Sequence, residues 1–197
     1  MNKWDQRYSS KGFVYGTEPN DFLAEQAHRI PAGACLSLAD GEGRNGVYLA
    51  SLGYKVTSVD SSEVGLAKAR QLAEQKGVEL YTVHRDLADF QFEPSSFAGI
   101  VSIFCHLPPA LRKEVYRKSV SALQPGGVLI LEGYTPEQLS KGTGGPPTLD
   151  LLLSIDQLKQ DLDGLDFLVA QETERDIQEG NLHTGIGSVA QVVAVKR

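Results

Sequence analysis

A glycine-rich loop and two acidic residues, each after an apolar run, have the types and spacing of a nucleoside-binding site. In SLADGEGRNGVYLA (residues 37–50), Gly41, Gly43 and Gly46 match the pattern Gly-x-Gly-x-x-Gly. Asp60 follows nineteen positions after Gly41 (60 − 41), where such loops are typically followed by a carboxylate that binds a ribose. Asp86 stands after the next apolar run, in HRDLADF. The pattern predicts that the chain binds a nucleotide or a nucleoside.

The glycine pattern alone is also typical of NAD-dependent enzymes, but three features favour a mononucleoside. The predicted nucleotide fold takes up the whole chain and leaves no separate substrate domain. It also ends in a hairpin, where a dinucleotide domain would continue with parallel strands. Finally, carboxylates after two successive strands, Asp60 and Asp86, suit a mononucleoside that lies across neighbouring strand ends. A single-domain NAD(P)-linked reductase remains as an alternative.

These residues must be positioned by alternating strands and helices, which the pattern of apolar residues predicts from residue 34 onward. We expect strands at 34–39, 54–59, 78–83, 98–104 and 128–134, and helices at 19–30, 44–52, 62–76 and 108–123. The sequence PGG at 125–127 is expected to end the last of these helices. Strands that are almost entirely apolar indicate a parallel sheet covered on both faces, with its ligand beyond the carboxyl ends of the strands.

The last part of the chain breaks the alternation. Ser154 and Gln157 have the spacing of a capping box that opens a short helix. Two strand-like runs follow at 165–174 and 188–196, joined by a loop of about a dozen residues, so they should pair antiparallel. The sequence therefore predicts a doubly wound, Rossmann-like α/β sheet of seven strands whose last pair is an antiparallel hairpin.

We expect a single domain over residues 1–197. It divides into an N-terminal cap segment and helix (1–33), a cofactor-binding core (34–134), a loop rich in glycine and proline (135–153), and a helix with the terminal hairpin (154–197). The net charge of −6 argues against general binding to nucleic acid or to an anionic membrane. The two cysteines show no metal-ligand or disulfide spacing, and the first residues lack a secretion signal, so we expect a cytoplasmic monomer without a metal.

Taken in order, LSLADGEGRNGVYLA, VTSVD, HRDLADF and LQPGGVLIL resemble the class I S-adenosylmethionine-dependent methyltransferases. The opening WDQRY and the GRN-containing stretch look most like the small bacterial type related to tellurite-resistance and thiopurine methyltransferases. The resemblance implies S-adenosylmethionine as the cofactor and a small-molecule acceptor, such as a thiol or a chalcogen oxyanion. A non-catalytic module that only binds the cofactor is a further alternative.

The glycine loop departs from the pattern of that family, Asp/Glu-x-Gly-x-Gly-x-Gly. Ser37 stands in place of the acidic residue and Ala39 in place of the first glycine, while Gly41 and Gly43 match the other two. The alanine is a mild change if its φ angle is negative. Ser37 supplies no charge, so other groups would have to bind the amino-acid end of the cofactor. Gly46 belongs to the following helix and completes the dinucleotide pattern by accident.

Within the family resemblance, each motif residue has an expected role. Gly41 and Gly43 let the backbone approach the cofactor, because a Cβ there would collide with it. Asp60 accepts hydrogen bonds from the ribose hydroxyls, although it could also be only a helix cap. Asp86 binds the adenine amino group, or only forms a local turn. The remaining expected cofactor contacts are Asn45, Ser61 and Leu87.

The methyl group should lie at the end of the fourth strand, at Phe104, Cys105 and His106. Phe104 and Cys105 could equally be core residues, and His106 could cap the following segment, but His106 is the best-placed histidine for touching the cofactor or the acceptor. In related enzymes an aromatic N-terminal segment folds over the cofactor. There Arg7 would meet its carboxylate, while Tyr8 and Tyr15 would wall the transfer chamber. Both this segment and the loop from residue 135 are expected to act as mobile lids.

Overall fold

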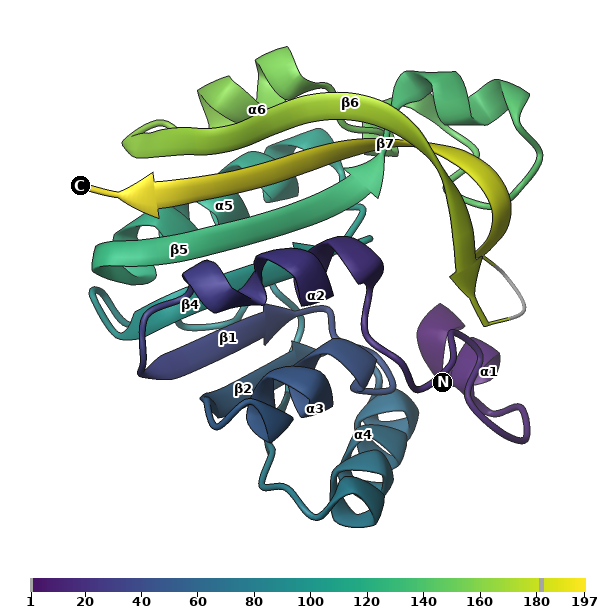
Figure 1. Cartoon of the computed structure of the whole chain (residues 1–197). Helices are drawn as coiled ribbons and strands as arrows, with labels where there is room; N and C mark the ends of the chain where they lie inside the picture. Colours follow the sequence, from purple (N-terminus) through teal and green to yellow (C-terminus); the bar gives the residue numbers. More distant parts are fainter. Residues whose placement is uncertain (1, 181–182) are drawn as a thin grey trace.

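The computed structural model describes residues 2–180 and 183–197 and shows a seven-stranded sheet (Figure 1). The strands lie in the order β3-β2-β1-β4-β5-β7-β6; β5 pairs antiparallel with β7, β7 pairs antiparallel with β6, and the other neighbours are parallel. The bounds of the strands are β1 Ala34–Leu38, β2 Lys55–Asp60, β3 Tyr81–His84, β4 Phe97–Ile103, β5 Leu123–Tyr134, β6 Leu165–Glu179 and β7 His183–Lys196. The predicted fold class is confirmed, including the antiparallel terminal pair.

Helices cover both faces of the sheet. Three of them, α2, α3 and α4, lie on the near face in Figure 1, whereas α5 and α6 lie behind it. The short helix α1 stands beyond the carboxyl ends of β1 and β2 (Figure 1). The helix bounds are α1 Lys3–Tyr8, α2 Asp21–Gln26, α3 Arg44–Ser51, α4 Glu63–Lys76, α5 Pro109–Ala122 and α6 Ile155–Asp161, with 3-10 turns η1 Ala27–Arg29, η2 Pro136–Ser140 and η3 Leu149–Leu151.

Local sequence explains where several helices begin and end. The Ser62 hydroxyl accepts from the backbone N–H of Gly65 and caps α4, which ends at Gly77 with a left-handed φ of 67°. In α6, the expected cap Ser154 accepts from the backbone N–H of Gln157. The sequence thus specifies where α4 begins and ends and where α6 begins.

The starts of two strands and the end of one helix differ from the expectation. Strand β3 begins at Tyr81, so residues 78–80 are not part of it. Helix α5 ends at Ala122, before PGG, and β5 already begins at Leu123. The PGG segment therefore lies inside the strand, where Gly126 adopts a φ of 78° and the pairing with β4 shifts register between Phe97 and Gly99. A glycine that bends a strand is common at such an irregularity.

The terminal hairpin is much longer than predicted. The expected loop of a dozen residues is wrong, because β6 continues to Glu179 and β7 starts at His183, with Glu179 paired to His183. The added strand residues are polar, which made them look like a loop. Their inward-facing charges are paired within the protein, as with Glu179, and Ile177 is buried among them. Figure 1 shows the tip of this hairpin bending toward α1.

Among the described residues, no helix is both long enough and apolar enough to cross a bilayer.

Candidate functional site

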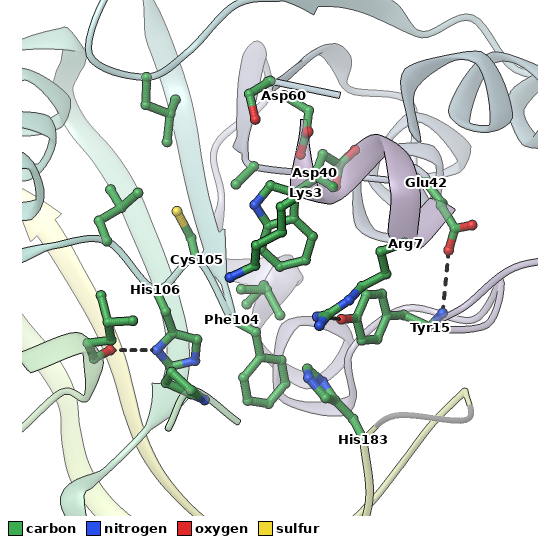
Figure 2. Close-up of a pocket in the computed structure, with 18 of the residues that line it drawn as sticks. Lys3, Arg7, Tyr15, Asp40, Glu42, Asp60, Phe104, Cys105, His106 and His183 are labelled. Atoms are coloured by element: carbon green, nitrogen blue, oxygen red, sulfur yellow. Dashed lines mark hydrogen bonds between the residues drawn. The ribbon is translucent and has the colours of Figure 1, made fainter. Parts of the chain in front are cut away.

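A cavity of about 660 Å³ lies at the carboxyl ends of the parallel strands, where α1 stands. Four neighbouring strands deliver residues to its wall in the order β3-β2-β1-β4. The contributions are Asp86 after β3, Asp60 at the end of β2, Ala39 and Asp40 after β1, and Phe104 to His106 after β4. The chain reverses its winding between β1 and β4, and ligands of open α/β sheets bind at such a point. Figure 2 shows the side chains that converge there.

Asp60 presents a buried carboxylate to this cavity. One carboxylate oxygen accepts the backbone N–H of Gly41 at 2.8 Å, and the other accepts that of Ser62 at 2.8 Å. Among the described residues it forms no ion pair, and burial raises the pKa of Asp60 to about 6 despite these hydrogen bonds. A carboxylate has about four lone-pair positions, so each oxygen can still accept from a ligand. The alternative that Asp60 is the N-cap of α4 is wrong, because Ser62 occupies that position.

The two loop glycines are needed for packing within the protein and do not contact the cavity directly. Neither lines it. A Cβ on Gly41 would stand 2.4 Å from the Tyr8 hydroxyl, and one on Gly43 would stand 2.5 Å from the Cβ of Ala69 in α4. Within the protein, Gly41 therefore lets Tyr8 and Asp60 approach, and Gly43 lets α4 pack against the loop.

Asp40 supplies the carboxyl group that Ser37 lacks. Its buried carboxylate accepts from the Ser37 hydroxyl at 2.7 Å, the Ser58 hydroxyl at 2.5 Å and the backbone N–H of Gly46 at 3.2 Å. Burial raises the pKa of Asp40, and the serine hydrogen bonds oppose that shift. Ser37 itself does not line the cavity, whereas Asp40 does. Gly46 lies in α3, as expected, and a Cβ there would stand 2.3 Å from both Asp40 and Ser58.

Two residues at the cavity wall have left-handed backbone conformations. Ala39, directly after β1, has a φ of 48°, so the condition for a mild replacement of glycine is not met. Phe104, directly after β4, has a φ of 50° and donates its N–H to the Glu132 carbonyl at 2.7 Å. Such backbone strain costs about 1–3 kcal/mol per residue and clusters at functional sites. Here it lies at the ends of two neighbouring strands.

The other expected cofactor residues also reach the wall. Ser61, Asp86, Leu87 and Asn45 all line the cavity. Asp86 is exposed and accepts the N–H of Ala88 at 2.9 Å, so the local turn exists and leaves the carboxylate free to meet a ligand. Leu87 is buried beside it. The Asn45 side chain accepts the N–H of Asn20 at 3.0 Å and thereby fixes the chain that leads into α2.

The N-terminal segment covers the mouth of the cavity and is attached to α4. Asp5 accepts the Ser62 hydroxyl at 2.6 Å, and Tyr8 is buried against the glycine loop. Arg7 donates to the Tyr15 hydroxyl at 2.8 Å and lies over the Trp4 ring. Figure 2 shows Arg7 and Tyr15 side by side at the cavity. The aromatic segment therefore folds over the cavity, as the family resemblance implied.

At the far end, β4 and the loop after β5 close the cavity. Cys105 lies beyond β4 rather than within a strand, and burial raises the pKa of its thiol to about 12. Burial likewise lowers the pKa of His106 to about 4, although its Nδ1 contacts the carbonyl oxygen of Leu151 at 2.8 Å. The loop contributes Gly144, Gly145, Pro146 and Pro147 to the wall.

Beside the cavity, a buried network joins two glutamates with two arginines. Glu132, which is 0% exposed, accepts from Arg175 at 2.5 Å, and Glu179 accepts from Arg44 at 2.5 Å. Arg175 also donates to Glu179 at 2.9 Å, and Asn20 bridges both glutamates at 2.7 and 2.9 Å. The network fixes the tip of the hairpin against α3 and the start of α2.

Sequence reasoning missed several residues of the wall. Glu42 binds the backbone N–H of Val14 at 2.7 Å and Lys68 at 2.8 Å, and so holds the N-terminal segment to α4. The signal of Glu42 was weak, because only the folded chain brings its partners to it. His183 is different: the sequence offers it as an acceptor-site residue in the loop between the two terminal runs, and it lines the cavity from the first residue of β7. The wall residues that were not predicted include Lys3, Trp4, Gly16, Asp40, Glu42, Arg44 and Leu151.

Comparison with known proteins agrees with this geometry. Residues 35–127 match the family described as "Methyltransferase domain". The chain is 31% identical over 134 residues to the glycine/sarcosine N-methyltransferase of Halorhodospira halochloris, covering 66% of this chain and 47% of that protein. It spans less than half the length of the curated relatives that it matches.

Two solved structures have the same fold. One comes from work on the conversion of a disulfide bond into a thioacetal group during echinomycin biosynthesis (TM-score 0.80, 18% identity, 98% of this chain and 90% of that chain). The other is TehB from Haemophilus influenzae (TM-score 0.72, 21% identity, 98% of this chain and 66% of that chain).

Fold and site together define an open α/β sheet with a cavity across the ends of β1 to β4, where sheets of this kind bind their ligands. More specifically, residues 35–127 of this chain match a methyltransferase domain.

Proposed function

We propose that the protein is an S-adenosylmethionine-dependent methyltransferase that acts on a small-molecule acceptor, either a thiol or a chalcogen oxyanion. The observation that carries this proposal is the cavity of about 660 Å³ into which four neighbouring strand ends deliver two carboxylates, a glycine-loop residue and His106. Its volume lies within the range of about 300–1,000 Å³ that is typical of small-molecule and cofactor pockets.

The residues of the cavity fit the nucleoside part of this cofactor. Asp60 accepts from both ribose hydroxyls, with Ser61 beside it, because a buried carboxylate without an ion partner is best satisfied by neutral donors. Asp86 accepts from the adenine amino group, and Leu87 packs on the ring. These contacts place the base toward β3 and the sugar at β2, in the order in which the strands lie.

The amino-acid end of the cofactor lies between the glycine loop and α1. Asp40 attracts the ammonium group, and Arg7 attracts the carboxylate, since both side chains line the cavity with opposite charges. Tyr8, Ala39 and Asn45 form the surrounding wall. Ser37, Gly41 and Gly43 act indirectly: Ser37 orients Asp40, Gly41 orients Asp60, and Gly43 allows α4 to pack.

The reacting end lies at Phe104, Cys105, His106 and Tyr15. When bound, the cofactor supplies an already activated methyl group on a sulfonium, so the protein needs no group to activate an electrophile. The side chains of this end orient an acceptor lone pair, and the N-terminal segment and the loop Gly144–Pro147 exclude water. Soft acceptors react well with such a methyl group. One structural neighbour comes from work on the conversion of a disulfide bond into a thioacetal group, which supports a sulfur acceptor.

The whole chain acts as one domain and as a monomer, in the cytoplasm, without nucleic acid or membrane. Support comes from the net charge of −6, which disfavours polyanionic partners, and from the two free, buried cysteines.

Calorimetry with S-adenosylmethionine, adenosylhomocysteine and NAD⁺ tests the cofactor. We expect binding of the first two and not of the third; the reverse would overturn the proposal. Release of adenosylhomocysteine is then measured with 2-mercaptoethanol, selenite, tellurite and glycine as acceptors. Turnover with a thiol or a chalcogen oxyanion supports the acceptor class. Turnover with glycine alone would instead assign the chain the chemistry named for its curated relative.

A further inference from the structure

Aromatic rings gather at the reacting end of the cavity. Tyr15, Phe104, His106 and His183 line this end, which we call the aromatic chamber. Phe104 lies at its centre, with its ring centroid 4.8 Å from that of His183 and 6.2 Å from that of His106. Tyr134 stacks behind His106 at 5.7 Å. Figure 2 shows these side chains converging from β4, β7 and the N-terminal segment.

His106 has a fixed tautomer in this chamber. Its Nδ1 lies 2.8 Å from the Leu151 carbonyl oxygen, which can only accept, so Nδ1 carries the hydrogen. Burial, together with the neighbouring charges of His183 and Arg112, lowers the pKa of His106 to about 4, and the ring is therefore neutral at pH 7. A neutral imidazole has one N–H, which leaves a lone pair on Nε2.

That lone pair has no partner. Nε2 is buried and forms no hydrogen bond within residues 2–180 and 183–197. In Figure 2 the ring turns this nitrogen away from Leu151, toward the side where Phe104 lies. A buried acceptor without a donor costs about 1–3 kcal/mol. A ligand with an X–H group would remove this cost, whereas a fully deprotonated oxyanion would place a second negative potential against the lone pair.

The surroundings favour sulfur as the atom that carries this hydrogen. A thiol has one weak donor, which matches the one free lone pair, and its sulfur packs well at the edges of aromatic rings about 5 Å away. An ordinary thiol has a pKa of about 8.5, so it enters the chamber mostly protonated at neutral pH.

Building on the proposed function, we infer that the acceptor is a thiol bound in its protonated form, and that His106 Nε2 accepts its proton. The acceptor sulfur forms a bond to the methyl carbon while the bond from that carbon to the sulfonium sulfur breaks, which leaves a neutral thioether on each side. The S–H bond breaks in the same process, and its proton passes to Nε2. The imidazolium then returns the proton to water when the chamber opens.

The tautomer can be measured without turnover. With ¹⁵N-labelled histidine, the four histidines give separate ring signals, and His106→Asn assigns those of His106. We expect a protonated Nδ1 and an unprotonated Nε2, and a shift of the Nε2 signal when 2-mercaptoethanol is added to the protein saturated with adenosylhomocysteine. A hydrogen on Nε2, or no response to the thiol, would overturn the inference.

Kinetics with two probe thiols tests the proton transfer. His106→Asn removes the base, while its amide can still donate to Leu151. Rates with 2-mercaptoethanol, which is protonated at neutral pH, should fall about 100-fold or more. Rates with 4-nitrobenzenethiol, which is already ionised, should change by less than about threefold, because no proton remains to be removed.

Equal losses with both thiols would show that His106 only shapes the wall, and would overturn the inference. His28→Asn, at an exposed histidine outside the cavity, is the matched control. If neither thiol is methylated although adenosylhomocysteine binds, the Nε2 signal is the test: a shift on addition of 2-mercaptoethanol supports the inference, and no shift overturns it. Absence of adenosylhomocysteine binding would instead contradict the proposed function.

Discussion

At the scale of single residues, the site depends on carboxylates that the fold buries without cations. Asp60 is the clearest case, since two backbone N–H groups orient it and burial raises its pKa to about 6. The protein thus holds a hydrogen-bond acceptor in place, although burial of the carboxylate removes its hydration and destabilises the charged form. Hydrogen bonds from a neutral sugar diol offset this desolvation without introducing a second charge.

Asp60→Asn should weaken the binding of adenosylhomocysteine about 10- to 100-fold. A hydrogen bond to a charged group contributes about 1.5–3 kcal/mol, and each 1.4 kcal/mol corresponds to about a factor of ten. Calorimetry of the variant measures the change, with Asp89→Asn as control because Asp89 is exposed and outside the cavity. An unchanged affinity in Asp60→Asn would remove Asp60 from the ribose site.

The same carboxylate predicts a pH dependence of cofactor binding. The pKa of Asp60 is raised to about 6 by burial, and only the ionised form accepts fully from both hydroxyls. Affinity should therefore be constant above about pH 7 and fall, by up to about tenfold per pH unit, as the pH drops below about 6. Calorimetry across this range in the wild-type protein tests the expectation. The Asp60→Asn variant should show a weaker pH dependence there, which leaves the contribution of Asp40, whose pKa burial also raises.

Asp86 and Asp89 form a matched pair within one loop. Asp86 lines the cavity and Asp89 does not, although both are exposed. Asp86→Asn should weaken adenosylhomocysteine binding about three- to tenfold, because a solvent-exposed acceptor contributes less than a buried one. Asp89→Asn should leave it unchanged. Competition between adenosylhomocysteine and its inosine analogue, which lacks the amino group, gives a second readout: the analogue should bind both variants alike.

Residue spacing was enough to predict Asp60, Asp86 and the strand-end position of His106, since each follows directly from a strand boundary. It was not enough for Asp40. That carboxylate acts at the site only because Ser37 and Ser58 fold around it and Gly46 leaves room, which are contacts between separate elements. The left-handed conformation of Ala39 could likewise not be predicted, because no residue type other than glycine reliably indicates a left-handed φ angle.

At the scale of elements, the N-terminal segment and the loop 135–150 both line the cavity. The segment is held by side-chain contacts such as Asp5 to Ser62 and Glu42 to Val14, and the loop by contacts such as Thr143 to the Ile186 carbonyl. These are few compared with the ladders of the sheet, so local opening should cost much less than global unfolding.

Amide hydrogen exchange tests the two lids. Both segments should exchange quickly in the free protein and become protected about tenfold or more when adenosylhomocysteine is bound, whereas β1 and β4 should change little. Equal protection in both states would make the segments fixed structure. Protection of the N-terminal segment alone would assign the loop to recognition of the acceptor.

The sequence predicted the parallel strands better than the terminal hairpin for a physical reason. Buried strands such as β1 and β4 are apolar throughout, and their apolar runs are visible in the sequence. The ends of β6 and β7 are polar because their charges pair with Arg44 and Glu132 from distant elements. No pattern within residues 175–187 reveals those partners.

At the scale of the whole molecule, the buried network of Glu132, Glu179, Arg44 and Arg175 joins the two halves of the chain. Arg175→Met should destabilise the protein by about 3–5 kcal/mol, since it leaves a buried charge unpaired. The double variant Glu132→Gln with Arg175→Met should recover part of this loss. Urea unfolding of both variants and of the wild type gives the free energies; a loss below about 1 kcal/mol would show that water enters the network.

The network also gives the stability of the fold a pH dependence in the acid range. Burial alone would raise the pKa of Glu179, but the neighbouring His183, whose Nδ1 lies 3.9 Å away, and the Arg44 charge outweigh it and lower the pKa to about 2. A lowered pKa adds stability that is complete above about pH 5 and is lost as the pH falls from about 4.5 toward 2. Glu179→Gln should remove most of this acid sensitivity in urea unfolding curves.

The attachment of α1 has a practical consequence for handling the protein. Asn2 donates to the Ser61 carbonyl at 2.6 Å and caps α1 beside the cavity mouth, so a peptide fused ahead of it would leave the protein next to the ligand entrance. The carboxyl terminus lies at the opposite end of the strands (Figure 1), where the Lys196 ammonium group donates to the Leu123 carbonyl at 2.6 Å. An affinity tag for the binding and turnover measurements therefore belongs after Arg197.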